Sequence, residues 1–382
     1  MRMVKYIMMR LQSSTETNES DIMQMVKYAM IATVMMVGGL FLTGCGVSEY
    51  ITREYNVRNE AQLREAFANV GNNEVVKIIL GIDIELQGGD LRVPVGSTII
   101  IDTPQGTFSN PPRSIIRVAG EERHFHVPYQ ATLNIRGNVT IQSQQNATNA
   151  SAPTVNRGGI TVNGGTLNTS GSITIRNNRW SEGGGVSVEN GGTFNWNATG
   201  NISENVTSGN GGGVFVQGNS RFAHTGTGNI SNNIAGGNGG GVFIQGNSSF
   251  SRNGTGSINE NIANGNGGGI FIQGNSSFNR TGTGNINNNT AHIDGGGIFA
   301  NGSDVRITIS ATGSISGNTA QRGGGVALLN GAHFTRTGTG SVSNNTGGNI
   351  DEIDDDSNLP INNEPNIIET PQPQPGGGNQ RQ

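Results

Sequence analysis

The strongest constraint in this sequence is a Gly-Gly-Gly triplet that returns every 28 residues. The triplets begin at Gly183, Gly211, Gly239, Gly267, Gly295 and Gly323. A fixed period of this length is typical of solenoids, in which each repeat contacts only its neighbours. Each unit is dominated by Gly, Asn, Ser and Thr and has no apolar residues at helical spacing. The repeat therefore predicts short strands and turns instead of helices.

Equivalent apolar residues of successive units predict the core. Aliphatic columns start at Val186 and Val188, a Phe column at Phe194 and an Ile column at Ile202. In-register strands would stack each column at about 4.8 Å, and residues two apart on a strand share a face. The sequence thus predicts an all-β fold, a parallel β-helix of 28-residue coils. An asparagine ladder at the following turn would satisfy buried turn groups: Asn205, Asn233, Asn261, Asn289, Asn318 and Asn345.

The low charge content agrees with stacking in register. Only 13% of the residues are charged and 62 are glycine. Like charges about 5 Å apart repel by roughly 0.8 kcal/mol even in water, and a strict repeat would multiply that cost. The net charge of −4 and the absence of Lys or Arg runs argue against a nucleic-acid partner.

The N-terminal segment is predicted to direct export. Residues 28–42 are apolar, follow Lys27, and at about 15 residues are too short to span a bilayer. We expect residues 1–24 to precede the true start, residues 25–44 to be a signal peptide and residues 45–52 to be a linker. An ordinary signal peptide with a chance cysteine, or a short membrane anchor, is the alternative.

The solenoid domain is predicted to span residues 53–350, with six regular repeats over 183–350 and about ten coils in all. Residues 59–70 predict a capping helix, with Asn59 as N-cap and Gly71 as the stop. A helix over the first coil would protect its open edge. Residues 351–382 are acidic and then rich in Pro and Gly, which predicts a disordered tail.

Two resemblances extend this interpretation. Leu42-Thr43-Gly44-Cys45 resembles the lipobox of bacterial lipoproteins, which implies a lipid on Cys45 and attachment to the outer membrane or cell surface. The segment "ISNNIAGGNGGGVF" (230–243) resembles the paired motifs of the polymorphic outer-membrane protein family, and residues 53–102 are similar to the start of pectate-lyase-like β-helices. These resemblances imply a right-handed β-helix displayed for adhesion to host glycans or proteins. The family's C-terminal β-barrel has no counterpart in residues 351–382, so the lipid would supply the anchor.

Two columns are candidate ligand-binding surfaces. Strand alternation sends Phe215, Phe243, Phe271 and Phe299 outward, where they are either exposed or covered by a lateral loop. The second column is Trp196, His224, Arg252, Arg280 and Arg336. Strict alternation would bury these arginines at high cost, so we expect the strand to turn a corner there and expose them.

The sequence predicts no catalytic residue, metal or cofactor. The carboxylates between Gly158 and Ile350 do not occupy equivalent positions in adjacent coils, as paired acid/base or metal chemistry would need: Glu182, Glu189, Glu204, Glu260, Asp294 and Asp304. His124 and His126, in the irregular coils, are expected to be exposed strand residues or else to line a pocket. A column of threonines (Thr199, Thr227, Thr255, Thr283, Thr312 and Thr339) is interpreted as a turn stack, with ordering of water as the alternative.

These observations predict a non-catalytic lipoprotein that serves as an adhesin or structural rod. One alternative is a polysaccharide lyase or glycoside hydrolase of the pectate-lyase type, which converging carboxylates before Gly158 would support. Another is a homotypic assembly protein that pairs through the Phe column or through the C-terminal end of the solenoid, for which the sequence predicts no cap.

Overall fold

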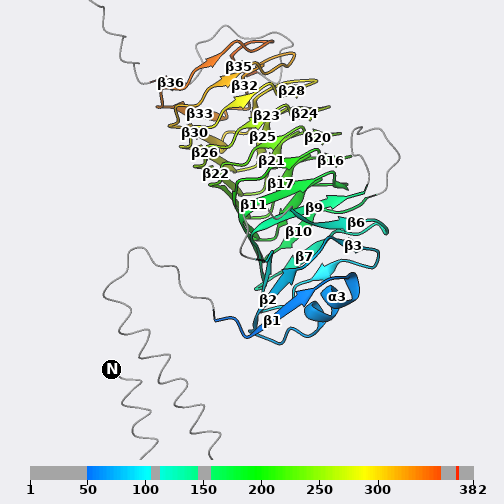
Figure 1. Cartoon of the computed structure of the whole chain (residues 1–382). Coiled ribbons are helices and arrows are strands. Elements are labelled where there is room, and N and C mark those ends of the chain that lie inside the picture. Colours follow the sequence, from blue (N-terminus) through cyan, green and yellow to red (C-terminus); the bar gives the residue numbers. More distant parts are fainter. Residues whose placement is uncertain (1–49, 105–111, 145–155, 354–366, 370–382) are drawn as a thin grey trace, which may run out of the picture. The chain divides into compact units, whose positions relative to one another are not determined.

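The computed structural model describes residues 50–104, 112–144, 156–353 and 367–369. The chain divides into two units, Met1–Tyr50 and Ile51–Gln382, and the second is a parallel β-solenoid of about nine coils (Figure 1). Every pairing between its named strands is parallel, as the sequence predicts, for example Val214 with Val242 and Val242 with Ile270. The predicted signal peptide and Cys45 lie outside the described residues. None of the described helices is sufficiently long and apolar to cross a membrane.

The strands form four stacks, here named sheets A to D. Sheet A contains β1 (Arg53–Val57), β2 (Val75–Leu80), β5 (Thr98–Asp102), β8 (Thr132–Ile135), β11 (Thr166–Arg176), β14 (Thr193–Ala198), β18 (Arg221–His224), β22 (Ser249–Arg252), β26 (Ser277–Arg280), β30 (Arg306–Ile309), β33 (His333–Arg336) and β36 (Ile367–Glu369). Sheet B contains β3 (Ile84–Leu86), β6 (Arg113–Arg117), β9 (Asn138–Ser143), β15 (Ile202–Ser203), β19 (Ile230–Ser231), β23 (Ile258–Asn259), β27 (Ile286–Asn287), β31 (Ile315–Ser316) and β34 (Val342–Ser343). The long strand β11 belongs to both sheets, since its first part pairs with β14 and its end with β15.

The other two stacks complete each coil. Sheet C contains β4 (Leu91–Arg92), β7 (Phe125–Pro128), β10 (Ile160–Asn163), β13 (Val186–Glu189), β17 (Val214–Val216), β21 (Val242–Ile244), β25 (Ile270–Gln273), β29 (Ile298–Asn301), β32 (Val326–Leu329) and β35 (Ile350–Ile353). Sheet D contains β12 (Arg179–Trp180), β16 (Val206–Thr207), β20 (Ile234–Ala235), β24 (Ile262–Ala263) and β28 (Thr290–Ala291). Two-residue strands in sheets B and D reflect the short apolar runs between Gly and Asn turns in the sequence.

The core follows the predicted columns. The aliphatic residues of sheet C and the Phe residues of sheet A are almost fully buried, and Phe222, Phe250 and Phe278 stack ring on ring with centroids 4.6 and 4.9 Å apart. Ile307 continues the Phe column in the next coil, as the one-residue shift of that unit predicts. Burying one such side chain contributes roughly 1.5–3 kcal/mol, so a column repeated over six coils stabilises the whole solenoid.

The predicted asparagine ladder is confirmed at the corner between sheets B and D. The Asn261 carboxamide accepts from both the backbone N–H and the Nδ2 of Asn233, at 3.0 and 2.9 Å. Its own Nδ2 donates to Ile230 O and to Asn289 Oδ1, both at 2.9 Å. The same pattern extends one coil earlier than predicted, to Asn178. Each buried amide is therefore fully satisfied by the coils on either side.

The two ends differ from each other. Helix α3 (Glu60–Ala68) begins after the N-cap Asn59, whose side chain accepts from Gln62 N, and buries Leu63, Ala66 and Phe67 against the first coils. This confirms the predicted capping helix. At the other end, β35 pairs with β32 and β36 pairs with β33, so sheets A and C continue past residue 350, where the sequence predicted a disordered tail.

Candidate functional site

The outward Phe column is a second, smaller core and not an open surface. Phe215, Phe243, Phe271 and Phe299 are 2–4% exposed. Their rings stack with centroids 4.9–5.2 Å apart and pack with Ala327 and Ile353. The first glycine of the triplet before each of these strands lies against the base of the Phe side chain. A Cβ on Gly239, whose φ is +67°, would lie 2.9 Å from the Cβ of Phe243, so only glycine lets the backbone pass this close to the base of the Phe side chain.

The arginine column is also buried, and the predicted corner is wrong. Trp196, His224, Arg252 and Arg280 follow one another in register along sheet A, and all four are fully buried. Arg336 is half-buried, and Ile309 separates it from Arg280. Strict alternation holds through this strand, so these side chains point inward and present no ligand surface.

Backbone carbonyl oxygens, not carboxylates, accept from the buried cations. Arg252 donates to Gly284 O at 3.0 Å and also to Gly256 O, and Arg280 donates to Gly284 O at 2.7 Å. His224 Nε2 contacts Gly228 O at 2.8 Å in the same way. The inward glycines leave room for the long side chains, because a Cβ on Gly284 would collide with the Arg252 guanidinium.

Burial shifts the titration of this column. Desolvation holds the pKa of Arg280 down to about 10, and desolvation together with the charge of Arg280 lowers the pKa of Arg252 well below its usual range. Within the described residues, Arg280 Nη1 and Nε and Arg252 Nε have no hydrogen-bond partner. The column therefore carries an electrostatic cost that the carbonyl contacts only partly offset.

Sequence reasoning missed a shallow groove at the end of sheet C. Its volume is about 580 Å³, and four Gln-Gly or Asn-Gly pairs of successive coils line it: Gln217, Gly218, Gln245, Gly246, Gln273, Gly274, Asn301 and Gly302. Gln273 Nε2 donates to Gln245 Oε1 at 2.9 Å, and Gln245 Nε2 to Gln217 Oε1 at 3.2 Å. The only sequence signal was the triplet Gln-Gly-Asn at one position of three units. We name this feature the amide groove.

The amide groove offers hydrogen bonds without charge. Its lining contains no ionisable side chain. The backbone N–H groups of Gly218, Gly246 and Gly274 donate to no acceptor among the described residues. Amide side chains both donate and accept, so the groove presents the same donor and acceptor set once per coil, at steps of about 4.8 Å.

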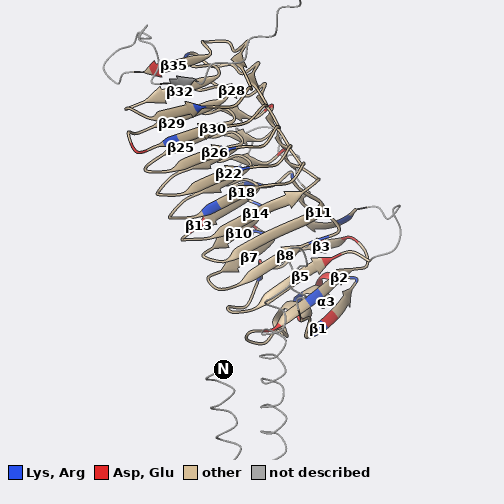
Figure 2. Cartoon of the chain, turned by 90° about the vertical axis from the view of Figure 1, so that its left-hand side faces the viewer, with Lys and Arg blue, Asp and Glu red and all other residues tan. Residues whose placement is uncertain are grey.

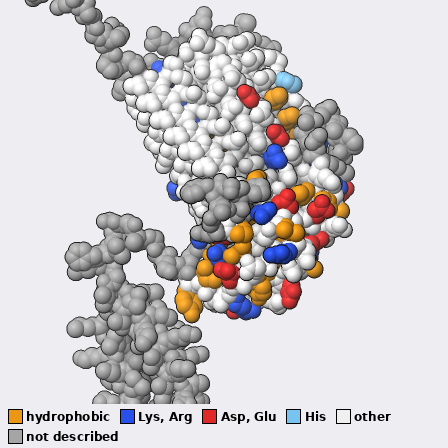
Figure 3. Space-filling model, viewed as in Figure 1, with side chains coloured by type: hydrophobic (Ala, Val, Ile, Leu, Met, Phe, Trp, Pro, Cys, Tyr) orange, Lys and Arg blue, Asp and Glu red, His pale blue; other side chains and the backbone are white. Residues whose placement is uncertain are grey.

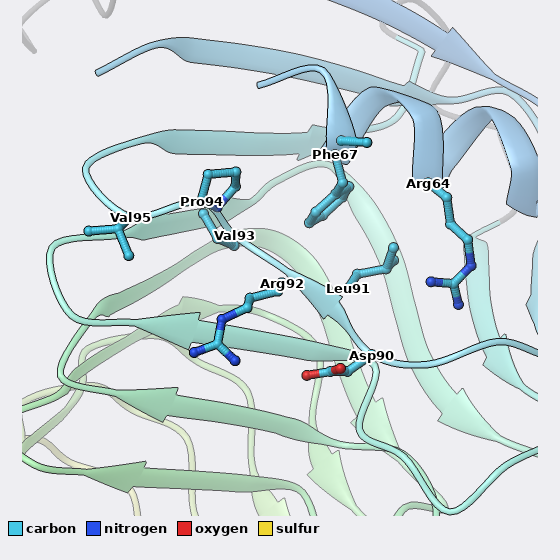
Figure 4. A pocket seen from close by; sticks show the side chains of 9 residues that line it. Arg64, Phe67, Asp90, Leu91, Arg92, Val93, Pro94 and Val95 are labelled. Atoms are coloured by element: carbon cyan, nitrogen blue, oxygen red, sulfur yellow. The ribbon is translucent and has the colours of Figure 1, made fainter. Parts of the chain in front are cut away.

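A second pocket lies under the capping helix (Figure 4). It has a volume of about 490 Å³ and an apolar side formed by Phe67, Leu91 and Val93. Arg64 reaches it from α3, but its guanidinium already donates to Glu60 and to Gly89 O, at 2.8 and 2.6 Å. Asp90 is the one carboxylate of its lining, so the pocket does not hold the carboxylate pair of an acid/base site.

The two irregular-coil histidines have separate environments. His124 is fully buried, against the sequence prediction: its Nδ1 accepts from Gly159 N at 3.0 Å and its Nε2 lies 2.9 Å from Gln142 O. Burial lowers the pKa of His124 to about 3, so the ring is neutral at pH 7. His126 stays partly exposed with Nδ1 4.0 Å from Asp90 Oδ2. No group of three or more His, Cys, Asp and Glu side chains suited to a metal ion is found among the described residues.

Charged and apolar side chains gather on the first coils, while the upper coils on the same side are dominated by uncharged polar groups (Figure 3). The comparisons add no functional assignment to this geometry. No family model, no curated protein and no solved structure matches the chain.

Proposed function

We propose that this protein is a non-catalytic, adhesin-like binding rod, held to the bacterial outer membrane or cell surface by a lipid on Cys45. The amide groove is its contact surface, in place of the two buried columns. The observation that carries the proposal is the repetition of one uncharged amide and glycine pair over four successive coils.

The chemistry of the amide groove fits a neutral glycan of a host surface. Sugar hydroxyl groups both donate and accept, as do the carboxamides of Gln217, Gln245 and Gln273. Glycines between the amides let a sugar ring approach the backbone closely. Several weak contacts at a constant step add up along a polymer, which is how a shallow groove reaches useful affinity.

The test uses the full-length protein, retained on panels of neutral and acidic glycans and on host cells. We expect the double variant Gln245→Ala with Gln273→Ala to lose at least tenfold in retention on neutral glycans. The matched control, Asn264→Ala, changes an exposed residue of the sheet D side and should bind normally. Retention that is equal in both variants would remove the amide groove from the proposal.

The anchor is tested separately. Cells that express the wild type should incorporate labelled fatty acid into the protein, and Cys45→Ser should abolish incorporation and release the protein from the membrane fraction. Incorporation of labelled fatty acid into the Cys45→Ser protein would contradict the lipobox assignment. It would not affect the proposal that the amide groove binds glycans.

A polysaccharide-cleaving enzyme is the second candidate, and the pocket under α3 is the place for it, because Asp90 and Arg92 line this pocket and Asp90 Oδ2 lies 4.0 Å from His126 Nδ1. Polymer cleavage is scored in the same wells as retention. Products that disappear in Asp90→Asn would favour the enzyme over the adhesin.

A further inference from the structure

A broad face of the rod, distinct from the amide groove, is built from small uncharged residues. It consists of four columns spaced two residues apart, which run from the outer side of sheet A toward sheet B. We name it the threonine face. Its columns are Asn195, Ala223, Ser251, Asn279, Thr308 and Thr335; Asn197, Thr225, Asn253, Thr281, Ser310 and Thr337; Thr199, Thr227, Thr255, Thr283, Thr312 and Thr339; and Asn201, Asn229, Ser257, Asn285, Ser314 and Ser341.

The threonine face is open to solvent. All members of the second and third columns are exposed, and those of the outer columns are exposed or half-buried except Ala223. Between them lie buried residues, mostly glycine, such as Gly254 and Gly256. The alternation of exposed and buried residues continues through the Thr-Gly-Thr-Gly segments, which are therefore a surface with two-residue spacing rather than irregular turns. Figure 2 shows this side toward the viewer, with charged residues sparse on it.

The interior holds the threonine face rigid. The inward glycines allow close stacking, because a Cβ on Gly254 would collide with the carbonyl of Gly226 in the preceding coil. The buried guanidiniums of Arg252 and Arg280 lie beneath the same segments and hydrogen-bond to their carbonyls. This arrangement gives the buried cations a role: they fill the space under the glycines and fix the backbone that presents the threonines.

Side chains of the face bond along the rod from coil to coil. Thr281 Oγ1 donates to Asn253 Oδ1 at 2.9 Å, and Thr337 Oγ1 donates to Ser310 Oγ at 2.9 Å. The third column is threonine in every coil, and the other three columns vary among Asn, Ser and Thr with one Ala, so every coil presents hydroxyl or amide groups to solvent. A second copy carries an identical grid at the identical step, so the two grids can satisfy each other over every coil.

The size of the face fits an interface between two copies. Two residues along a strand advance about 6.6 Å and one coil about 4.8 Å, so four columns over six coils cover on the order of 750 Å². A stable interface buries roughly 800 Å² on each partner. The four columns contain no aromatic side chain to stack on a sugar ring and no charged side chain to attract a charged partner, and the half-buried Arg336 lies between the first two columns only in the last coil. Small side chains permit the close, dry contact seen between paired β-sheets.

We infer that the threonine face binds the threonine face of a second copy of this chain. The exposed Arg221 and Arg306 stand in the next column outward and limit the contact at that margin. Pairing is independent of the amide groove, and it joins rods either on one cell or between neighbouring cells.

The test exploits the single cysteine of the chain, Cys45. Thr255→Cys in the full-length protein, oxidised on the producing cells, should give a disulfide-linked dimer on a non-reducing gel. The matched control, Asn264→Cys, places an exposed cysteine on the sheet D side and should stay monomeric. Absence of a dimer from Thr255→Cys, or equal dimer from both variants, would overturn the inference.

A charge variant adds an independent measurement. Thr225→Lys with Thr283→Lys, introduced into the Thr255→Cys protein, sets like charges on both flanking coils and should lower the dimer yield at least tenfold. Asn264→Lys with His292→Lys adds the same charge on adjacent coils of the sheet D side and should leave the yield unchanged. A dimer yield that Thr225→Lys with Thr283→Lys leaves unchanged would contradict the inference. If the Thr255→Cys protein forms no dimer and the addition of Thr225→Lys with Thr283→Lys abolishes glycan retention, the threonine face binds a glycan instead.

Discussion

At the scale of the residue, the buried polar side chains of this protein rely on main-chain carbonyls and on one another for hydrogen bonds, and not every nitrogen of the arginine column finds a partner among the described residues. His224 belongs to a column in which Trp, His and Arg occupy equivalent positions of successive coils, and none of the contacts described above pairs them with a carboxylate. His224, Arg252 and Arg280 each reach the carbonyl four residues on, such as Gly228 O or Gly256 O, whereas Trp196 Nε1 has no partner among the described residues. Of the side chains that reach this carbonyl, only neutral histidine does so without burying a charge.

We therefore predict that acid destabilises the protein before its carboxylates titrate. Burial lowers the pKa of both His224 and His124 to about 3, against about 6.5 in the unfolded chain. Between these values the unfolded state binds more protons, so stability is full above about pH 6.5 and is lost as the pH falls. Each histidine contributes at most about 1.4 kcal/mol per pH unit.

The measurement is urea unfolding between pH 5 and pH 7. The wild type should lose stability across this window, and His224→Gln, which keeps a donor but cannot become charged, should lose less. A slope for His224→Gln as steep as that of the wild type would show that the column does not hold a neutral ring.

At the scale of the element, the alternation of inward and outward side chains along a strand was a better guide to the arginine column than the desolvation argument that replaced it. Alternation alone places Arg252 inward, and the expected desolvation cost led to the wrong prediction of a corner. The carbonyls that reduce this cost belong to Gly256 and Gly284, one turn and one coil away, and no local pattern reveals them. The outward direction of Phe243 was predicted, but its burial depends on ring stacking with the neighbouring coils and on packing with Ala327 and Ile353 at the end of the column, which were left open at the level of the sequence.

The exposed threonines show the opposite case. Their column was visible in the sequence, yet Thr-Gly-Thr-Gly is typical of turns, so a surface was not predicted. The asparagine ladder was predicted at all six regular repeats because its chemistry requires nothing beyond the repeat itself, namely one amide per coil at a turn; Asn178, in an irregular coil, was missed.

The ladder yields a prediction of large effect at one residue. Asn261→Ala removes the acceptor of the Asn233 N–H and Nδ2 groups and the donor to Ile230 O. Each buried group left without a partner costs about 1–3 kcal/mol, so we expect a loss of about 3 kcal/mol or more. The exposed Asn264→Ala should stay within about 0.5 kcal/mol of the wild type. Denaturant unfolding of both variants measures the difference. Similarly small losses of unfolding free energy in both would mean that the ladder contributes little to stability.

At the scale of the whole molecule, the solenoid is one unit repeated, and its stability should behave as a sum of coils and of contacts between neighbours. Deleting residues 239–266 removes one complete repeat and joins Asn238 to Gly267, which is the residue equivalent to Gly239. All side-chain columns then continue across the junction, because Phe222 packs on Phe278 and Asn233 bonds to Asn289. We expect this variant to fold, with the same far-ultraviolet circular dichroism per residue and a modestly lower melting temperature.

Deleting only residues 253–266 is the control, since it removes half a coil. The strand that follows Arg252 would then begin at the triplet of Gly267, and sheet C residues would meet the positions of sheet B, so no column could continue across the junction. Because each coil is stabilised only by its neighbours, the break should separate the rod into two pieces that melt at different temperatures, or prevent folding. A half-coil deletion that melts as one transition near the wild type would contradict the assignment of one 28-residue repeat to one turn of the solenoid.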